Sequence, residues 1–228
     1  MLTKRLIACF DIISGMVTKA VQFQDNINVA PADALAETMY NAQVDELIFY
    51  DITASAEKIS IDSMAVRNPQ IISDGAKAFG SQCIVLSTQV KKSEQMPSGY
   101  EVYIDGARLA TGMDAVEWIK RGQDLGAGEI CVNSIDNDGT LCGYDLELMK
   151  LAETAVSVPL IASGGAGKPE HLKVLFTDTD VQAAIISSML YSPRMERNYT
   201  VSELKEYLLQ NGINIRPILS FCAESQNL

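Results

Sequence analysis

The chain has 228 residues and is 47% hydrophobic, which is enough for a domain with a sizeable core and excludes wholesale disorder. A formal net charge of −11 argues against nucleic acid and anionic membranes as main partners, although backbone amides can still hold a phosphate. The sequence has no apolar run of the roughly 18 residues that a membrane span needs. We expect a cytoplasmic protein with one domain over residues 1–228 and a loosely held tail at 220–228.

The first half of the chain predicts strands where short apolar runs are rich in β-branched residues, and helices where apolar residues recur at helical spacing. Two helices are expected to begin near a proline, at residues 31–40 and 68–79. Strands are predicted at residues 5–11, 46–51, 58–62 and 82–87. The segment 17–23, which carries Lys19, follows a turn at Ser14 and Gly15.

The second half continues with the same alternation. Its polar stretch 93–112 allows a hairpin of residues 100–104 against 108–111, around Asp105 and Gly106. Helices are predicted at 115–124, around 146–152, at 171–176 and at 201–210. Strands are predicted at 129–135, 159–162 and 181–188, with a short strand-like segment at 214–217. Strands that alternate with helices predict an α/β fold with a parallel sheet.

Residues 128–167 hold the clearest ligand-binding signal. A strand ends in the turn-rich loop DNDGT, and a second strand ends in the glycine-rich loop SGGAG. Loops at the C-terminal ends of parallel strands are where α/β folds bind ligands, and the second loop leads into a helix whose amides can hold a phosphate. The sequence lacks a GxGxxG dinucleotide fingerprint, so we expect no cofactor. The five scattered cysteines favour free thiols over disulfides or a metal site.

The chain also contains an incomplete internal repeat. Residues 4–11 resemble 81–88, residues 45–53 resemble 128–136, and residues 56–63 resemble 181–188. The second half has a further strand at 159–162, and the first half has no counterpart. Residues 52–57 are too few for a crossover between parallel neighbours. Either the two flanking strands form a hairpin in an irregular barrel, or a helix, strand and helix are missing after Ser55; we favour the missing segment.

Several motifs together resemble the cyclase subunit of imidazole glycerol phosphate synthase, over nearly the whole chain. They are MLTKRLIACFDI, DELIFYDITAS, EKISIDS, FGSQCIV, GAGEICVNSIDNDGT, GYDLELM, VPLIASGGAG and ELKEYL. The resemblance implies a TIM-type (β/α)8 barrel of two similar halves, the first without its helix–strand–helix segment. It also implies a lyase of histidine biosynthesis, paired as a heterodimer with a glutaminase that sends ammonia through the barrel. Its phosphorylated substrate, a phosphoribulosyl-formimino-aminoimidazole carboxamide nucleotide, would yield imidazole glycerol phosphate and aminoimidazole carboxamide ribonucleotide.

The resemblance assigns catalysis to two aspartates at strand ends. Asp11 matches the first; without the resemblance, a carboxylate that caps the turn at Ser14 is an equal alternative. The second should end the fifth strand of the family's barrel, where the sequence places Thr88. A hydroxyl cannot replace a carboxylate acid or base at neutral pH, so this departure bears directly on the cyclisation step.

The resemblance also assigns substrate-binding residues. The first phosphate site comprises Ser163, Gly164, Gly165, Ser187 and Ser188, helped by Asp138 and Gly139. Of the second, only Asp62 and Ser63 remain, and Asp62 puts a charge where the family has an amide. Lys19 matches a substrate-side lysine, with an ordinary exposed lysine as the alternative. Asn133 is assigned to the substrate site or, equally, to stabilising a turn.

Four charged residues at strand starts match the family's ammonia gate: Arg5, Glu46, Lys58 and Glu129. From the residues alone, a solvated rim or salt bridges would explain them as well. Two alternatives to the cyclase stay open at this point. One is a paralogue that channels ammonia to another acceptor, such as a surface sugar, and the other is a non-catalytic barrel remnant.

Overall fold

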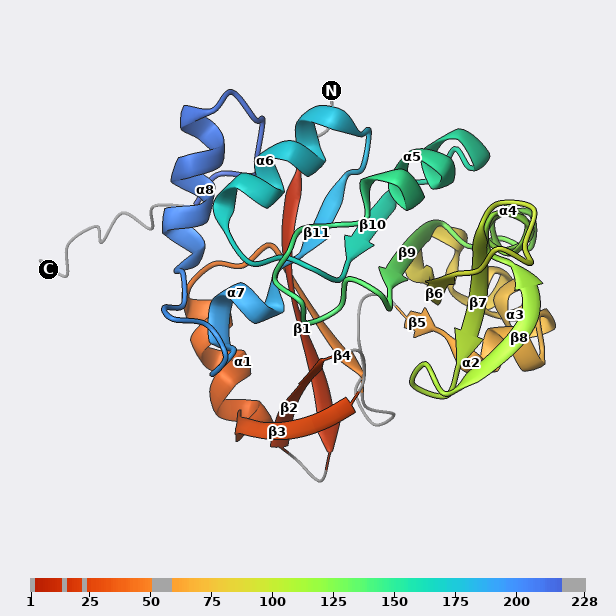
Figure 1. The fold of residues 1–228 in the computed structure, drawn as a ribbon, viewed down its shortest axis with the longest axis horizontal. Coiled ribbons are helices and arrows are strands. Elements are labelled where there is room, and N and C mark those ends of the chain that lie inside the picture. The colour runs from red at the N-terminus through yellow and green to blue at the C-terminus, as the bar shows by residue number, and fades with distance from the viewer. Residues whose placement is uncertain (1–2, 14–15, 22–23, 51–58, 219–228) are drawn as a thin grey trace, which may run out of the picture.

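A computed structural model describes residues 3–13, 16–21, 24–50 and 59–218 of the protein. Lys58, Ser55 and the tail at 220–228 lie outside these ranges. The described part is an α/β structure in which helices alternate with parallel strands (Figure 1). No helix among these residues is long and apolar enough to cross a membrane.

Seven strands form one parallel series in the order β4-β1-β11-β10-β9-β6-β5. They are β1 (Arg5–Ile13), β4 (Glu46–Tyr50), β5 (Ile59–Ile61), β6 (Ile84–Lys92), β9 (Glu129–Ser134), β10 (Leu160–Ser163) and β11 (Ala183–Ile185). In the ranges that the structure describes, no ladder joins β4 to β5, the two ends of the series. The hairpin alternative is therefore wrong, because each strand pairs in parallel with a different neighbour.

Two antiparallel hairpins extend this sheet. β2 (Met16–Val21) pairs with the end of β1, and β3 (Gln24–Pro31) pairs with β2. β7 (Tyr100–Ile104) pairs with both the end of β6 and β8 (Leu109–Asp114), which confirms the predicted hairpin. β3 was not predicted, since its sequence QDNINVAP has few apolar residues and it is defined by its pairing with β2.

The helices lie along the outside of the parallel series, with α6 beside α8 (Figure 1). They are α1 (Ala32–Asn41), α2 (Ser63–Arg67), α3 (Gln70–Phe79), α4 (Ala115–Asp124), α5 (Leu146–Ala155), α6 (Pro169–Asp178), α7 (Ser187–Tyr191) and α8 (Val201–Gln210), with a short 3-10 turn at Ser81–Cys83. Three starts have side-chain caps: the Asp114 carboxylate accepts two amides of α4, Asp145 accepts the Leu148 amide of α5, and Thr200 and Glu203 form a capping box at α8.

Successive residues of each strand face opposite sides of the sheet and separate two apolar clusters. The larger cluster packs the outer sides of the strands against the helices; from β1 it takes Leu6, Ala8 and Phe10. The smaller cluster lies on the inner side, where β1 contributes Ile7 and Cys9. We call these sides the outer face and the inner face.

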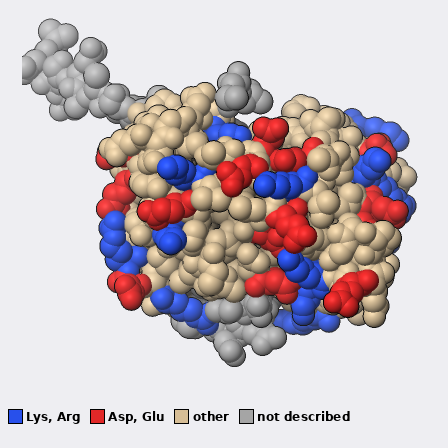
Figure 2. All heavy atoms as spheres, turned by 45° about the horizontal axis from the view of Figure 1, so that its top comes forward, with Lys and Arg blue, Asp and Glu red and all other residues tan. Residues whose placement is uncertain are grey.

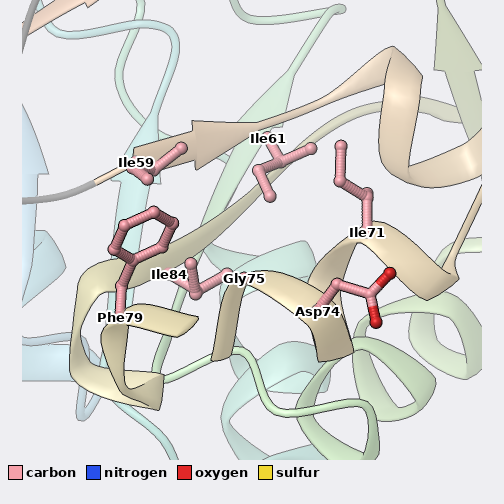
Figure 3. A pocket seen from close by; sticks show the side chains of 7 residues that line it. All are labelled: Ile59, Ile61, Ile71, Asp74, Gly75, Phe79 and Ile84. Carbon is pink, nitrogen blue, oxygen red and sulfur yellow. The ribbon is translucent and has the colours of Figure 1, made fainter. Parts of the chain in front are cut away.

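The surface beside β5, at the end of the parallel series in the described residues, is apolar. An apolar cavity of about 360 Å³ lies between β5 and α3, lined by Ile59, Ile61, Phe79 and Ile84 among others (Figure 3). Phe79 is 59% exposed, so much of this surface faces solvent. Where strand and helix meet solvent in this way, a further strand and helix would bury them.

The four described cysteines carry free thiols, with Cys9 and Cys131 buried, Cys83 partly buried and Cys142 exposed. Cys222 lies outside the described residues. Within those residues no three His, Cys, Asp or Glu side chains gather so as to hold a metal ion. On the face seen in Figure 2, acidic and basic side chains are interspersed.

Candidate active site

Polar side chains gather where three neighbouring strands of the series end. Asp62 directly follows β5, Gln89 lies near the end of β6, and Asn133 lies near the end of β9. The register pairs Gln89 with Asn133, and Asn133 with Ser163 of β10. These residues therefore line one end of the inner face, at the C-terminal ends of the strands.

The centre of this cluster is a carboxylate held by an amide. Gln89 Nε2 donates a hydrogen bond of 2.6 Å to Asp62 Oδ2. Burial raises the pKa of the Asp62 carboxyl to about 6; the bond from Gln89 acts in the opposite sense, and the nearby Asp105 charge adds to the rise. At neutral pH this group exchanges protons more readily than an ordinary aspartate.

Two oxygens beside it are buried without a hydrogen-bond partner among the described residues. They are Gln89 Oε1 and Asn133 Oδ1. A buried acceptor without a donor costs free energy, and such a group at a strand end is suited to accept a hydrogen bond from a ligand. The end of the inner face is therefore an incomplete polar surface rather than a sealed core.

The glycine loop that follows β10 packs closely against the loop after β9. Gly164 and Gly165 have φ values of +92° and +102°. A Cβ on Gly165 would lie 2.0 Å from Gly143 O, and one on Gly164 would lie 2.7 Å from Ser134 O. Gly143 N also donates a 2.8 Å bond to Gly165 O. Only glycine fits these positions, and the loop presents backbone rather than side chains to the strand ends.

The opposite end of the inner face carries an ion-pair network. Arg5 of β1 bonds to Glu46 of β4 at 2.5 Å, and its other terminal nitrogen bonds to Glu129 of β9. All three side chains are largely buried. The pKa of the Arg5 guanidinium is raised: burial acts to lower it, but the bonds and charges of Glu129 and Glu46 outweigh that effect.

This network crosses the inner face from β1 to β9. β1 and β9 are separated by β11 and β10, so a flat sheet would hold them about 14 Å apart, at roughly 4.8 Å per strand. Arg5 nevertheless contacts Glu129. The two long side chains thus bridge the inner face across the strands that lie between them.

Between the two ends the inner face is mostly apolar, with the hydroxyls of Ser60 and Ser87 on the same side. Its buried side chains come from β1, β6, β9, β10 and β11, with Ile48 of β4 packed against them; they are Ile7, Cys9, Val85, Cys131, Ile161, Ala183 and Ile185. Charged residues lie at one end and polar residues at the other. A small neutral molecule is the kind of species that could pass through such an apolar interior, whereas an ion would lose its hydration there.

Comparison with known proteins fits this architecture. A family profile described as "Histidine biosynthesis protein" matches residues 54–196. The chain is 41% identical to the imidazole glycerol phosphate synthase subunit HisF of Desulforapulum autotrophicum, over 95% of the chain and 99% of that protein. It is 42% identical to the corresponding subunit of Desulfatibacillum aliphaticivorans, over 95% and 98%.

The chain belongs to the HisF family. A third relative, HisF of Solidesulfovibrio magneticus, is 40% identical over 96% of the chain and the whole of that protein. The family has the TIM-barrel fold, so the seven parallel strands are the observed part of a (β/α)8 arrangement. Membership confirms the expected family and fold class.

The relatives also bear on the missing segment. The first alignment extends over 260 residues and the chain has 228, so at least 32 positions of that alignment have no residue here. The chain is thus shorter than these HisF proteins. A gap after Ser55 stays a prediction; it is supported by the break in the parallel series between β4 and β5, where a (β/α)8 barrel has one more strand.

The structure shows which side of the sheet Thr88, the predicted counterpart of the second catalytic aspartate, faces. Leu86 and Val90 belong to the outer cluster and Val85 to the inner one, so strand alternation places Thr88 on the outer face. Thr88 is buried there, and the residue of β6 that faces the substrate end is Gln89. Thr88 therefore faces away from the strand-end cluster, and which residue of β6 takes the predicted catalytic position stays a prediction; neither Thr88 nor Gln89 can act as an acid or base at neutral pH.

Two serines of the predicted phosphate sites have other partners. Ser187 Oγ accepts a bond of 2.7 Å from Cys9 N and donates one of 2.8 Å to Cys9 O, so the hydroxyl is used to tie α7 to β1. Ser63 Oγ accepts a bond of 3.0 Å from Asp105 N in the β7–β8 turn. The strand predicted at 181–188 ends at Ile185, and Ser187 and Ser188 begin the five-residue helix α7; their role at a phosphate stays a prediction.

The remaining predicted residues are placed by their backbones. Asp11 lies at the C-terminal end of β1, opposite Thr18 of β2 and Tyr50 of β4, and Lys19 follows on β2. Their side chains lie outside what the structure describes. Asp138 and Gly139 lie on the loop after β9; Asp138 N donates to Ser134 O at 2.9 Å, and Gly139 has a φ of +69°. All four are thus at the same end of the sheet as Asp62.

His171 has a role that sequence reasoning missed. Gly167 N donates a 3.2 Å hydrogen bond to His171 Nδ1, which ties α6 to the glycine loop. The pKa of His171 is lowered, first by burial and then by the Lys168 charge. The only sequence signal was the four-residue spacing between the glycine loop and this histidine.

Proposed function

We propose that this HisF family member is the cyclase subunit of an imidazole glycerol phosphate synthase and acts in histidine biosynthesis in the cytoplasm. It would take ammonia from a glutaminase subunit in a heterodimer. With that ammonia it would convert the phosphoribulosyl-formimino-aminoimidazole carboxamide nucleotide into imidazole glycerol phosphate and aminoimidazole carboxamide ribonucleotide. The proposal draws its substrate and partner from the family.

The observation that carries the proposal is the polarity of the inner face. One end has the Arg5 network, the middle is mostly apolar, and the other end combines the Asp62 carboxylate with the close-packed glycine loop. Ammonia is small and neutral, so an apolar passage suits it, and the loop's backbone suits a phosphate. Nothing observed favours the sugar-amidating paralogue.

The test is a synthase assay on the purified chain. With the ribulosyl nucleotide and an ammonium salt we expect imidazole glycerol phosphate and aminoimidazole carboxamide ribonucleotide in equal amounts. Reactions without ammonium serve as the control. Absence of both products at saturating substrate, from a chain that is folded by circular dichroism, would overturn the proposed activity.

Partnership needs a separate assay, because cyclisation can run on external ammonia. The glutaminase subunit from the same organism is added, and glutamine hydrolysis is measured with and without this chain. We expect stimulation and a 1:1 complex on gel filtration. A glutaminase rate that does not respond, together with separate elution of the two chains, would contradict the heterodimer and leave the ammonium-driven activity standing.

A further inference from the structure

We propose that Asp62 supplies, from β5, the proton-transferring carboxylate that the family resemblance places on the neighbouring strand β6. This inference rests on the proposed function, since it assigns a role in that reaction. The inner-face residue at the end of β6 is the amide Gln89, and within the described residues the carboxylate bonded to it is that of Asp62, directly after the neighbouring strand β5. Compared with what the resemblance implies, the carboxylate (Asp62) now follows β5 and the amide (Gln89) lies on β6, and the two side chains are hydrogen-bonded to each other.

Strand geometry and the bond from Gln89 place Asp62 on the inner face. β5 and β6 run parallel with Ile61 opposite Leu86, and both of these side chains belong to the outer cluster. Ile59 and Ile61 line the cavity beside α3 (Figure 3). Alternation then turns Ser60 inward, and the hydrogen bond from Gln89 places the Asp62 carboxylate on the same side.

The surroundings of Asp62 suit proton transfer better than structural support. No cation bonds to this carboxylate among the described residues; the charge that acts on its pKa is Asp105 in the β7–β8 turn, which itself pairs with Arg67 of α2 at 2.5 Å. A half-buried carboxylate without a cation costs stability, so a purely structural role would be served better by asparagine. Its pKa of about 6 suits a group that must both take and return a proton near neutral pH.

In the proposed step, Asp62 takes up one proton and later returns it. As the ammonia-derived nitrogen forms its bond to the formimino carbon, its proton passes to an Asp62 oxygen. The bond from that carbon to the departing amine breaks, and the amine nitrogen keeps the electron pair. That nitrogen then takes the proton back from Asp62. Asp62 ends as it began, and no oxidant or further reactant is needed.

The decisive variant is Asp62→Asn, which preserves size and can still accept the Gln89 hydrogen bond. We expect kcat to fall by a factor of about 10²–10⁴ while KM stays within about threefold. In the unmodified protein kcat/KM should rise with pH through a pKa of about 6 as Asp62 ionises, and this limb should vanish in the variant. Asp124→Asn, an exposed aspartate on α4, is the matched control and should change neither quantity.

The exchange of strands is tested by adding Gln89→Asp to Asp62→Asn. This returns the carboxylate to β6 and should recover at least about tenfold in kcat; no recovery contradicts the equivalence of the two positions. Suppose that the unmodified chain turns over. The inference alone is then overturned if kcat of Asp62→Asn lies within threefold of the unmodified value, or if kcat/KM of the variant still rises with pH through about 6. No turnover by the unmodified chain overturns the proposed function, and the inference with it.

Discussion

Lys205 Nζ lies 2.7 Å from Asp45 Oδ1, and both side chains are 2% exposed. The lysine comes from α8 and the aspartate directly precedes β4. Lys205 also donates to Gln43 O, while the other oxygen of Asp45 accepts a bond from Leu6 N of β1. One buried ion pair therefore ties the last helix to the two strands at the open end of the parallel series.

Replacing Lys205 by Met should destabilise the protein by about 3–5 kcal/mol, because it leaves the Asp45 carboxylate buried without its cation. Denaturant unfolding at pH 7 measures the change. Lys205→Met combined with Asp45→Leu should recover most of the loss, since no buried charge then remains uncompensated. If the single variant loses under 1 kcal/mol, the pair does not support the β4 end in the way the contacts indicate.

The Arg5 network offers a functional prediction at the other end of the inner face. Glu46→Gln removes one ion pair, while Arg5 keeps Glu129. We expect the rate with glutamine and the glutaminase subunit to fall several-fold, with the ammonium-driven rate unchanged, if this end receives ammonia. Glu147→Gln, which breaks the exposed pair with Lys92, is the control. An equal fall in both rates would argue against a gate.

The fold was predictable where local signals are strong. Residues 115–124 and 201–210 were predicted to the exact bounds of α4 and α8, because each helix pairs a clear apolar face with a capping residue. Residues 24–31 were missed, because β3 depends on pairing with β2. The sequence predicted a strand over residues 181–188, although α7 begins at Ser187, because a five-residue helix gives little periodicity.

The site was less predictable, for a geometric reason. A strand alternates sides at every residue, so the sequence alone did not show that Gln89, rather than Thr88, faces Asp62. The partners of Ser187 and Lys205 are 178 and 160 residues away in sequence. The resemblance supplied the site residues, but only the fold shows which side chains face one another.

Gly165→Ala should damage the glycine loop severely. The new Cβ would lie 2.0 Å from Gly143 O at a φ of +102°, so both a clash and backbone strain result. We expect KM for the phosphorylated substrate to rise by at least tenfold. Gly112→Ala is the control, because its φ of +70° carries a similar strain but its Cβ would meet nothing within 4 Å. A similar KM for both variants would mean that the close packing of the loop does not shape the phosphate site.

His171 predicts a pH effect on stability. Its Nδ1 accepts the Gly167 bond only when neutral, and the pKa is lowered in the folded state. A lowered pKa means that this stabilisation is complete above the unfolded pKa of about 6.5 and is lost as pH falls through the folded value. His171→Asn keeps an acceptor that does not titrate. Between pH 7 and 5 the variant should lose less stability than the unmodified protein in denaturant unfolding; a parallel loss would contradict the assignment.

Asp62 predicts the opposite pH dependence. Its folded pKa of about 6 lies above the ordinary value of 3.8, so the folded state binds the proton more tightly than the unfolded state. The resulting stabilisation is present below about pH 4 and is lost as pH rises through 6, leaving a buried charge at pH 8. Asp62→Asn should therefore gain on the order of 1–2 kcal/mol over the unmodified protein at pH 8 and almost nothing at pH 4. Asp124→Asn, which is exposed, should show no such difference. If Asp62→Asn gains stability at pH 8 and also loses turnover, Asp62 is kept for activity at the expense of stability. If the variant and the unmodified protein have equal unfolding free energies at both pH values, burial does not destabilise the Asp62 carboxylate.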